Sequence, residues 1–192
     1  MIEMIVSLTL FTVIMLAGTG TMLVVLDANR KAQSFQTAMD NLGVALEGIS
    51  RDMRVGTHYY CSPISFSSMV SFSSNQDCSP IGGLYFAFLP FGAANVTTNY
   101  WVYRLNNTSG KGVLERCKKG TSCADADYSA LTAPEINIKY FRIFVDNSNP
   151  LSAGNNIQSK ARIVIEGVAG TQAKTQTEFS VQTSISQFQL DL

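Results

Sequence analysis

The segment that begins Met1-Ile2-Glu3-Met4-Ile5-Val6-Ser7-Leu8 runs to Val55 without a proline, and the rest of the chain follows from it. From Met4 to Leu26 there are 23 consecutive residues without a charged side chain. A helix rises by about 1.5 Å per residue, so these residues would reach about 34 Å, enough to cross a bilayer core of about 30 Å. We therefore expect residues 4–26 to span a membrane.

The helix is expected to continue beyond the apolar run and to become amphipathic. Its apolar residues recur at alternating steps of four and three, which places them on one face of a helix. These positions are Ala28, Ala32, Phe35, Met39, Leu42, Leu46, Ile49 and Met53. The opposite face is polar and includes Gln33, Asp40, Glu47 and Arg51. One helix over residues 1–55 would thus lie half in a membrane and half against the domain that follows.

Residues 56–192 form the second predicted unit, a β-rich head domain. A Ser-rich connection over residues 62–79 is typical of a loop, and several later segments have the composition of strands. The expected strands cover residues 81–89, 100–105, 112–117, 136–145, 161–168 and 175–188. We predict an α+β fold in which the long N-terminal helix packs on an antiparallel sheet of five or six strands.

The four cysteines, Cys61, Cys78, Cys117 and Cys123, all follow the membrane segment. An even number in this part of the chain indicates disulfides, and hence a head outside the cytoplasm. Four cysteines allow three connectivities. The local pairing, Cys61 with Cys78 and Cys117 with Cys123, is favoured, and its larger loop would stabilise the fold by about 3 kcal/mol. No closely spaced Cys-x-x-Cys pair occurs, so we expect no metal site and no cofactor.

Charge gives two further constraints. The chain has 14 Lys+Arg against 14 Asp+Glu, so it offers no broad basic field to nucleic acid or anionic lipid. Arg30 and Lys31 follow the apolar run and no basic residue precedes it, which by the positive-inside rule would place the head in the cytoplasm. The cysteines indicate the opposite side. A short basic leader ahead of Met1 would reconcile these signals, and we expect one.

Residues 1–55 resemble the start of type IV pilins and type II secretion pseudopilins. Mature chains of that family begin Phe-Thr-Leu-Ile-Glu and continue as an apolar helix, and the stretch Met1-Ile2-Glu3 aligns Glu3 with the family's glutamate. The uncharged span, the glycines Gly18 and Gly20 in its middle and the amphipathic continuation are also shared. Residues 46–54 resemble the helix end of larger minor pilins and J-type pseudopilins. The family's cleavage glycine and N-terminal phenylalanine are not present in this sequence.

This resemblance implies a function and a set of partners. In the family, a prepilin peptidase removes the leader, the new N-terminus is methylated, and the glutamate neutralises the N-terminal amine of a neighbouring subunit. The chain would then be a structural filament subunit, a minor pilin or J-like pseudopilin, held in the inner membrane with its head outside before assembly. Its partners would be other pilin or pseudopilin subunits, the prepilin peptidase, the inner-membrane assembly platform and the membrane. Pilus, competence and secretion machines are all compatible with the sequence.

Two clusters in the head carry weaker signals. Asp125 and Asp127 offer carboxylate oxygens to calcium, but they lack the glycine and glutamate of a known calcium loop, which favours a solvated turn. Arg116, Lys118 and Lys119 could contact DNA phosphates, since related filaments take up DNA. The balanced charge of the head argues against strong DNA binding.

No catalytic function is expected. His58 is the only histidine, and neither a carboxylate pair nor an activated serine lies near it in the sequence. The competing function is a single-pass, membrane-anchored binding or adhesion domain that does not polymerise. Such a protein would use the same span and the same disulfide-bonded head. It would not need a carboxylate at Glu3 or a helix that continues unbroken past the membrane boundary.

Overall fold

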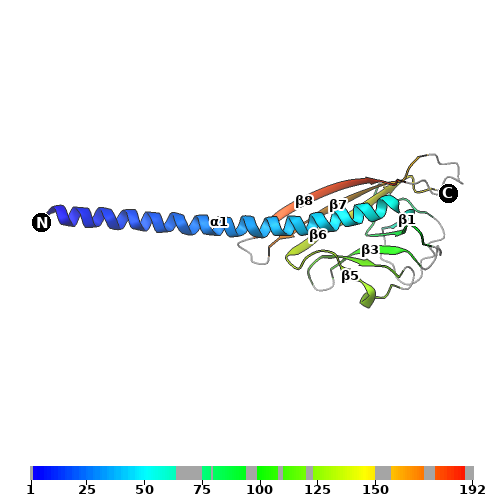
Figure 1. Cartoon of the computed structure of the whole chain (residues 1–192), viewed down its shortest axis with the longest axis horizontal. Coiled ribbons are helices and arrows are strands. Elements are labelled where there is room, and N and C mark those ends of the chain that lie inside the picture. Colours follow the sequence, from blue (N-terminus) through cyan, green and yellow to red (C-terminus); the bar gives the residue numbers. More distant parts are fainter. Residues whose placement is uncertain are drawn as a thin grey trace.

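The protein is a long N-terminal helix joined to a head that contains two antiparallel β-sheets (Figure 1). Helix α1 spans Ile2–Val55, its first half projects from the head, and its second half lies against the sheets. The computed structural model describes residues 2–63, 75–78, 80–93, 99–107, 110–119, 123–149, 157–170 and 176–188. The predicted α+β fold with a long N-terminal helix is confirmed.

The apolar stripe of α1 contacts the head only in the second half of the helix. The buried residues are Ala38, Leu42, Leu46, Ile49 and Met53, with Phe35 and Met39 partly buried beside them. The predicted stripe is wrong at its first two positions, because Ala28 and Ala32 are exposed. The contact with the head begins only after these residues, so nothing in the described chain covers them.

This one-sided packing predicts different costs for two substitutions on α1. Leu42 is 1% exposed, whereas Val44 is 73% exposed. Leu42→Ala should lower the free energy of unfolding of the head by about 2–5 kcal/mol, because it leaves a cavity in the core. Val44→Ala, the control, should change it by less than about 0.5 kcal/mol. Denaturation of the full chain in detergent measures both values, and equal costs would contradict the assignment of the packed face.

The first sheet contains five strands in the order β1-β2-β3-β4-β5, and all neighbouring strands are antiparallel. These strands are β1 (Thr57–Ser62), β2 (Tyr85–Leu89), β3 (Trp101–Asn106), β4 (Val113–Cys117) and β5 (Ser129–Ala130). A short 3₁₀ helix, η2 (Asp125–Asp127), precedes β5. The expected strands 100–105 and 112–117 form the antiparallel β3–β4 pair, in which Leu105 lies opposite Leu114.

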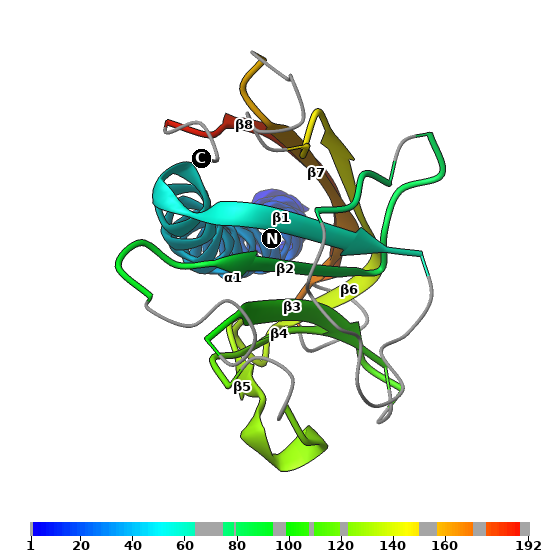
Figure 2. The same ribbon diagram turned by 90° about the vertical axis from the view of Figure 1, so that its right-hand side faces the viewer.

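The second sheet contains three long strands in the order β6-β7-β8. They are β6 (Ile136–Asp146), β7 (Lys160–Ala169) and β8 (Thr177–Ser186). Figure 2, viewed along the long axis, shows α1 flanked by strands of both sheets. The buried face of α1 and inward-facing residues of both sheets form one hydrophobic core. The head is therefore held to the helix by a shared core rather than by a flexible tether.

Residues 75–78 and 80–83 join the two sheets at a seam. Gln76 forms a parallel bridge to β1, and Gly83 forms an antiparallel bridge to Ile143 of β6. The Gly83 N–H donates to the Ile143 carbonyl at 2.6 Å. The Cys61–Cys78 disulfide lies at this seam, and a Cβ at residue 83 would collide with the Cys61 Sγ. The close approach therefore requires glycine at position 83.

The head differs from the prediction in its strands and sheets. The sequence predicts one sheet of five or six strands, whereas the described residues form eight strands in two sheets. The pattern does not reveal β1, because His58 has a φ of 54° and the pairing with β2 shifts between Thr57 and Tyr60. Strand β5 has only two residues, too few for a periodic pattern. Most of the predicted 62–79 connection, residues 64–74 and 79, lies outside the described residues.

Candidate assembly site

The projecting half of α1 presents a large apolar surface. Every residue from Ile2 to Gln33 is exposed, and none of the most apolar window of the helix is buried. Leu16 is 74% exposed and Phe11 is 55% exposed. Among the described residues, α1 is the one helix long and apolar enough to cross a membrane. An apolar surface of this extent is suited to a lipid or protein environment, because its exposure to water is unfavourable.

The hydroxyl groups of this half are satisfied within the helix itself. Each donates to a backbone carbonyl three or four residues earlier, at 2.8–3.1 Å. The donors are Ser7, Thr9, Thr12, Thr19 and Thr21. Such hydrogen bonds allow polar side chains to enter hydrocarbon at low cost, because no donor is left unpaired.

Glu3 differs from these hydroxyl residues because its carboxylate is charged. It lies in the first turn of α1, where the helix dipole favours an anion. Among the described residues, the ion pairs involve Arg104, Arg116 and Lys119 and none involves Glu3. A carboxylate beside an uncharged run of this length is costly unless a cation lies near it. The structure thus leaves Glu3 available to a cation from outside the described chain.

The helix continues unbroken through Gly18 and Gly20. Glycines in a helix can allow a kink or a close contact with another helix, and the structure has no break there. A Cβ built at either glycine meets nothing within 4 Å. The surface around them is open, and small residues at such a position permit close approach of another helix.

The C-terminal end of α1 is fixed to the head by hydrogen bonds that the sequence does not reveal. The Tyr59 hydroxyl donates to the Met53 carbonyl at 2.5 Å, and the Phe188 N–H donates to the Arg54 carbonyl at 2.7 Å. The Gln187 side chain donates to the carbonyl of Gly56 at 3.0 Å. These donors satisfy carbonyls that a helix end leaves unpaired. The projecting helix and the head are therefore connected rigidly.

An ion pair between Arg116 and Asp52 links β4 to α1 from the side. Their nearest atoms are 3.4 Å apart, and both side chains are largely buried. The Arg116 guanidinium also lies over the Trp101 ring, at 5.2 Å from its centroid, and Lys118 lies over the same ring at 4.3 Å. Burial raises the pKa of the nearby Tyr103 hydroxyl above its usual value. Arg116 thus serves to hold the helix to the head.

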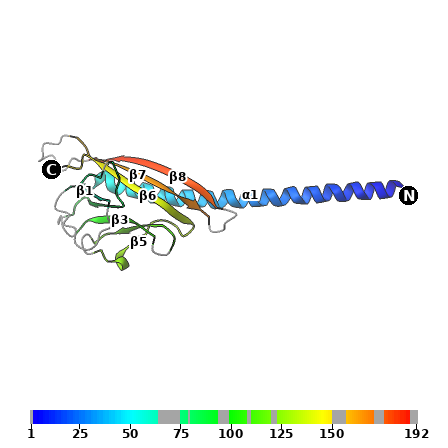
Figure 3. The same ribbon diagram turned by 180° about the vertical axis from the view of Figure 1, so that it is seen from behind.

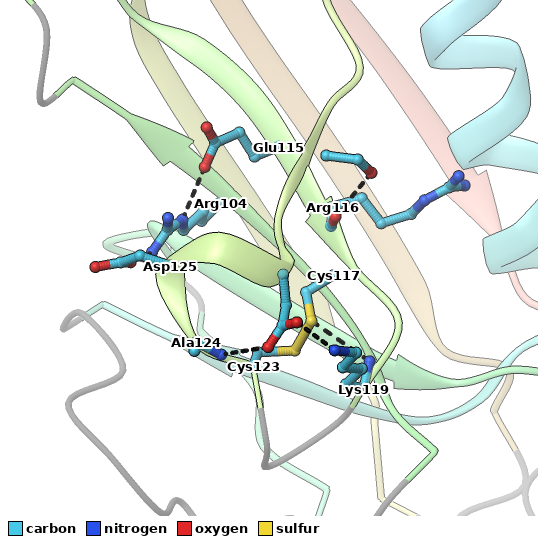
Figure 4. Close-up of a disulfide and its surroundings, with 10 residues drawn as sticks. Arg104, Glu115, Arg116, Cys117, Lys119, Cys123, Ala124 and Asp125 are labelled. Atoms are coloured by element: carbon cyan, nitrogen blue, oxygen red, sulfur yellow. Dashed lines mark hydrogen bonds and ion pairs between the residues drawn. A yellow bond between two sulfur atoms is a disulfide. The ribbon is translucent and has the colours of Figure 1, made fainter.

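The described cysteines form two disulfides with the local pairing, Cys61 with Cys78 and Cys117 with Cys123. The first bridge is almost completely buried at the seam, with Cys61 0% exposed. The second joins Cys117 of β4, which is 1% exposed, to the half-buried Cys123, and it holds the segment between β4 and β5 (Figure 4). No free cysteine occurs among the described residues. The two bridges therefore fix different parts of the head.

Charged residues fasten the segment around the second disulfide to β3. Arg104 binds Glu115 at 3.0 Å and Asp125 at 2.6 Å (Figure 4). Its guanidinium lies 3.6 Å from the centre of the Tyr128 ring. Burial raises the pKa of Tyr128 to about 12. Burial lowers the pKa of Arg104, but its hydrogen bonds to the two carboxylates outweigh this effect and leave the pKa raised.

The two aspartates that the sequence offers as calcium ligands have other partners here. Asp125 binds Arg104, and Asp127 binds Lys119 and the backbone N–H of Ala124. No group of three potential metal ligands occurs among the described residues. The basic residues weighed as possible DNA contacts are also partly engaged, because Lys119 binds Asp127 and Lys118 lies over the Trp101 ring.

The pair formed by Lys119 and Asp127 predicts a pH dependence. The hydrogen bond from Lys119 and that from the Ala124 N–H lower the pKa of Asp127 below its usual value. Stabilisation from a lowered carboxyl pKa is complete above the unfolded value of about 3.9 and is lost as the pH falls through the folded value. The protection of the amides in residues 123–130, measured as the ratio of intrinsic to observed exchange rate at each pH, should therefore fall in acid. Asp127→Asn should remove this pH dependence of the protection, and an unchanged acid profile in that variant would contradict the assignment.

Comparison with known proteins gives no relative. A scan against protein-family models, a search of curated proteins and a search of solved structures each found no match.

Proposed function

We propose that the protein is a structural subunit of a type IV pilus-like or type II secretion pseudopilus filament, in the role of a minor subunit. The observation that carries the proposal is the continuous helix from Ile2 to Val55, exposed and apolar in its first half and packed into the head core in its second. Such a helix suits two environments in turn, a bilayer and a bundle of similar helices. Because the helix is continuous, the head keeps a fixed position relative to the membrane segment.

Assembly would exchange lipid for protein around the same surface. In the bilayer, the apolar side chains contact acyl chains, and the internal hydrogen bonds of the hydroxyl residues reduce the cost of insertion. In a filament, the same side chains pack against helices of neighbouring subunits, and the open surface at Gly18 and Gly20 admits a close contact. The head remains folded throughout, because its core does not include residues 2–33.

Glu3 supplies the electrostatic part of this proposal. The carboxylate would neutralise the N-terminal amine of an adjacent subunit, so that neither charge enters the filament core alone. A charge pair within a low-dielectric core is stable only when both members are present. The pairing fixes the axial position of one subunit relative to the next, whereas apolar packing alone would allow sliding.

A membrane-anchored binding domain is the second candidate. It is favoured by the same exposed span and by the two disulfides, which suit a head outside the cytoplasm. It does not account for a carboxylate at Glu3. It also gives no reason for the rigid connection between the span and the head through Tyr59, Phe188 and Gln187.

Intact-mass analysis of the protein isolated from its native membrane, expressed from the full upstream reading frame, separates the two candidates. The filament proposal predicts a processed chain with a methylated N-terminal residue two positions ahead of Met1. An unprocessed and unmethylated N-terminus at Met1 would instead favour the anchored binding domain. The same sample gives the oxidation state of the four cysteines and so the compartment of the head.

A further inference from the structure

The outer face of the β6-β7-β8 sheet is a candidate binding surface separate from α1 (Figure 3). Residues alternate along each strand, and the inward-facing positions such as Ile143, Ile163 and Ile185 are buried in the core. The outward-facing positions are exposed or half-buried. They include Tyr140, Arg142 and Phe144 on β6, Arg162 and Val164 on β7, and Ser180, Gln182, Ser184 and Ser186 on β8.

Strand register places these side chains in two adjacent rows across the sheet. Arg142 lies opposite Val164, which lies opposite Gln182. In the next row, Phe144 lies opposite Arg162, which lies opposite Ser184. Arg142 and Arg162 are thus diagonal neighbours on one face, with Cβ atoms about 7 Å apart.

Both arginines are held in place by aromatic rings. The Arg162 guanidinium lies 4.6 Å from the centre of the Phe144 ring, and the Arg142 guanidinium lies 5.3 Å from the centre of the Tyr140 ring. Arg142 also donates one hydrogen bond to the Phe141 carbonyl at 3.1 Å. A cation–π contact restrains a guanidinium and leaves edge donors that can bind a carboxylate or a sulfate.

Neither arginine has a carboxylate partner in the described part of the chain, where the ion pairs all involve other cations. The carboxylates on this face lie outside the two central rows. Asp146 is opposite Lys160, Glu166 is opposite Tyr140, and Glu178 lies opposite Val168, one row beyond Glu166. The two central rows therefore carry two positively charged guanidinium groups whose remaining N–H donors are available to an anion. The hydroxyl and amide groups of β8 lie beside them.

We propose that this face binds an anionic polysaccharide, a chain of carboxylated or sulfated sugars. The acidic groups would bind the two guanidinium edges, and the sugar hydroxyls would hydrogen-bond to Gln182, Ser184 and their neighbours on β8. Single-stranded nucleic acid fits less well, because bases stack on open aromatic faces, whereas guanidinium groups already lie over Tyr140 and Phe144. The proposal concerns the folded head and does not depend on filament formation.

Binding of defined polymers to the full chain in detergent tests this proposal. The probes are polygalacturonate for carboxylated sugars, heparin for sulfated sugars, neutral dextran, and a single-stranded DNA oligonucleotide. At least one acidic polysaccharide should bind more tightly than both dextran and the DNA. The double variant Arg142→Gln/Arg162→Gln should weaken that binding by at least about tenfold, since two charge-assisted contacts are lost.

A matched control separates a built site from general charge attraction. Arg51→Gln/Arg54→Gln makes the same chemical change on α1, which packs against the inner face of the sheet, and should alter binding less than about twofold. Gln182→Ala/Ser184→Ala should weaken polysaccharide binding by about threefold or more without changing the charge. All variants should keep their melting temperature, because the substituted side chains lie outside the core.

Three results would overturn the proposal. One is no binding of either acidic polysaccharide. Another is an equal loss in the Arg51/Arg54 control, which would indicate charge attraction without a site. The third is tighter binding of the DNA oligonucleotide that is lost in Arg142→Gln/Arg162→Gln, which would assign the face to nucleic acid.

Discussion

Replacing Glu3 by leucine should abolish incorporation of the protein into filaments while leaving membrane insertion and the head intact. The substitution removes one member of the proposed charge pair and leaves the neighbour's amine uncompensated in the filament core. Leaving one charge of a buried pair unpaired costs about 3–5 kcal/mol, so incorporation should fall by at least about a hundredfold. Immunoblotting of the sheared filament fraction against the membrane fraction measures this ratio.

A second substitution on the same helix provides the control. Glu47 is exposed on α1 and, among the described residues, takes part in no ion pair. Glu47→Gln should be incorporated normally, whereas Glu3→Gln, the same chemical change in the apolar half, should fail as Glu3→Leu does. Normal filament incorporation of both Glu3 variants would refute the role assigned to Glu3 and would leave the anchored binding domain as the better account.

Removing the Cys61–Cys78 disulfide should destabilise the head more than removing the Cys117–Cys123 disulfide. The first bridge closes a sequence separation of 17 residues and the second one of 6 residues. The chain-entropy estimate gives about 3.2 kcal/mol for the longer loop and about 2.4 kcal/mol for the shorter loop. The first bridge also fixes the seam between the sheets, so its loss should exceed the entropic estimate.

The paired variants Cys61→Ala/Cys78→Ala and Cys117→Ala/Cys123→Ala test this order directly. Guanidinium unfolding of the two proteins in detergent gives the free energies, and hydrogen exchange shows where protection is lost. For the first pair, we expect faster exchange at the amides of Gly83 and Ile143, which hydrogen-bond across the seam. For the second pair, faster exchange should be confined to residues 123–130. A larger destabilisation on removal of the Cys117–Cys123 bridge would contradict the assignment of the seam.

The helix could be predicted from the sequence because its signals are local. An uncharged run, the absence of proline and a regular apolar stripe each depend on residues close together in the chain. The position where the head begins could not be predicted in the same way. Ala28 and Ala32 continue the stripe perfectly well, and their exposure follows from where the sheets end, which is a tertiary property.

The two-sheet arrangement could not be predicted from the sequence, because it depends on pairing between residues that are far apart in the chain. The bridge between Gly83 and Ile143 and the ion pair between Asp52 and Arg116 each join residues about 60 positions apart, and neither carries a local signal. The disulfide pairing was easier to predict from the sequence, since short loops limit the plausible pairings. Glu3 was a candidate from position alone, and the structure adds that the neighbouring hydroxyls are internally bonded.

Photo-crosslinking from the projecting half of α1 tests the central claim most directly. A photoreactive amino acid at Leu16, which is 74% exposed in the isolated chain, would report what covers this surface in cells that assemble filaments. If the protein is a filament subunit, the sheared filament fraction should contain adducts to the helix of a neighbouring pilin-like subunit, mapped by mass spectrometry. If the protein is an anchored binding domain, the chain should stay in the membrane fraction and form adducts only with lipid.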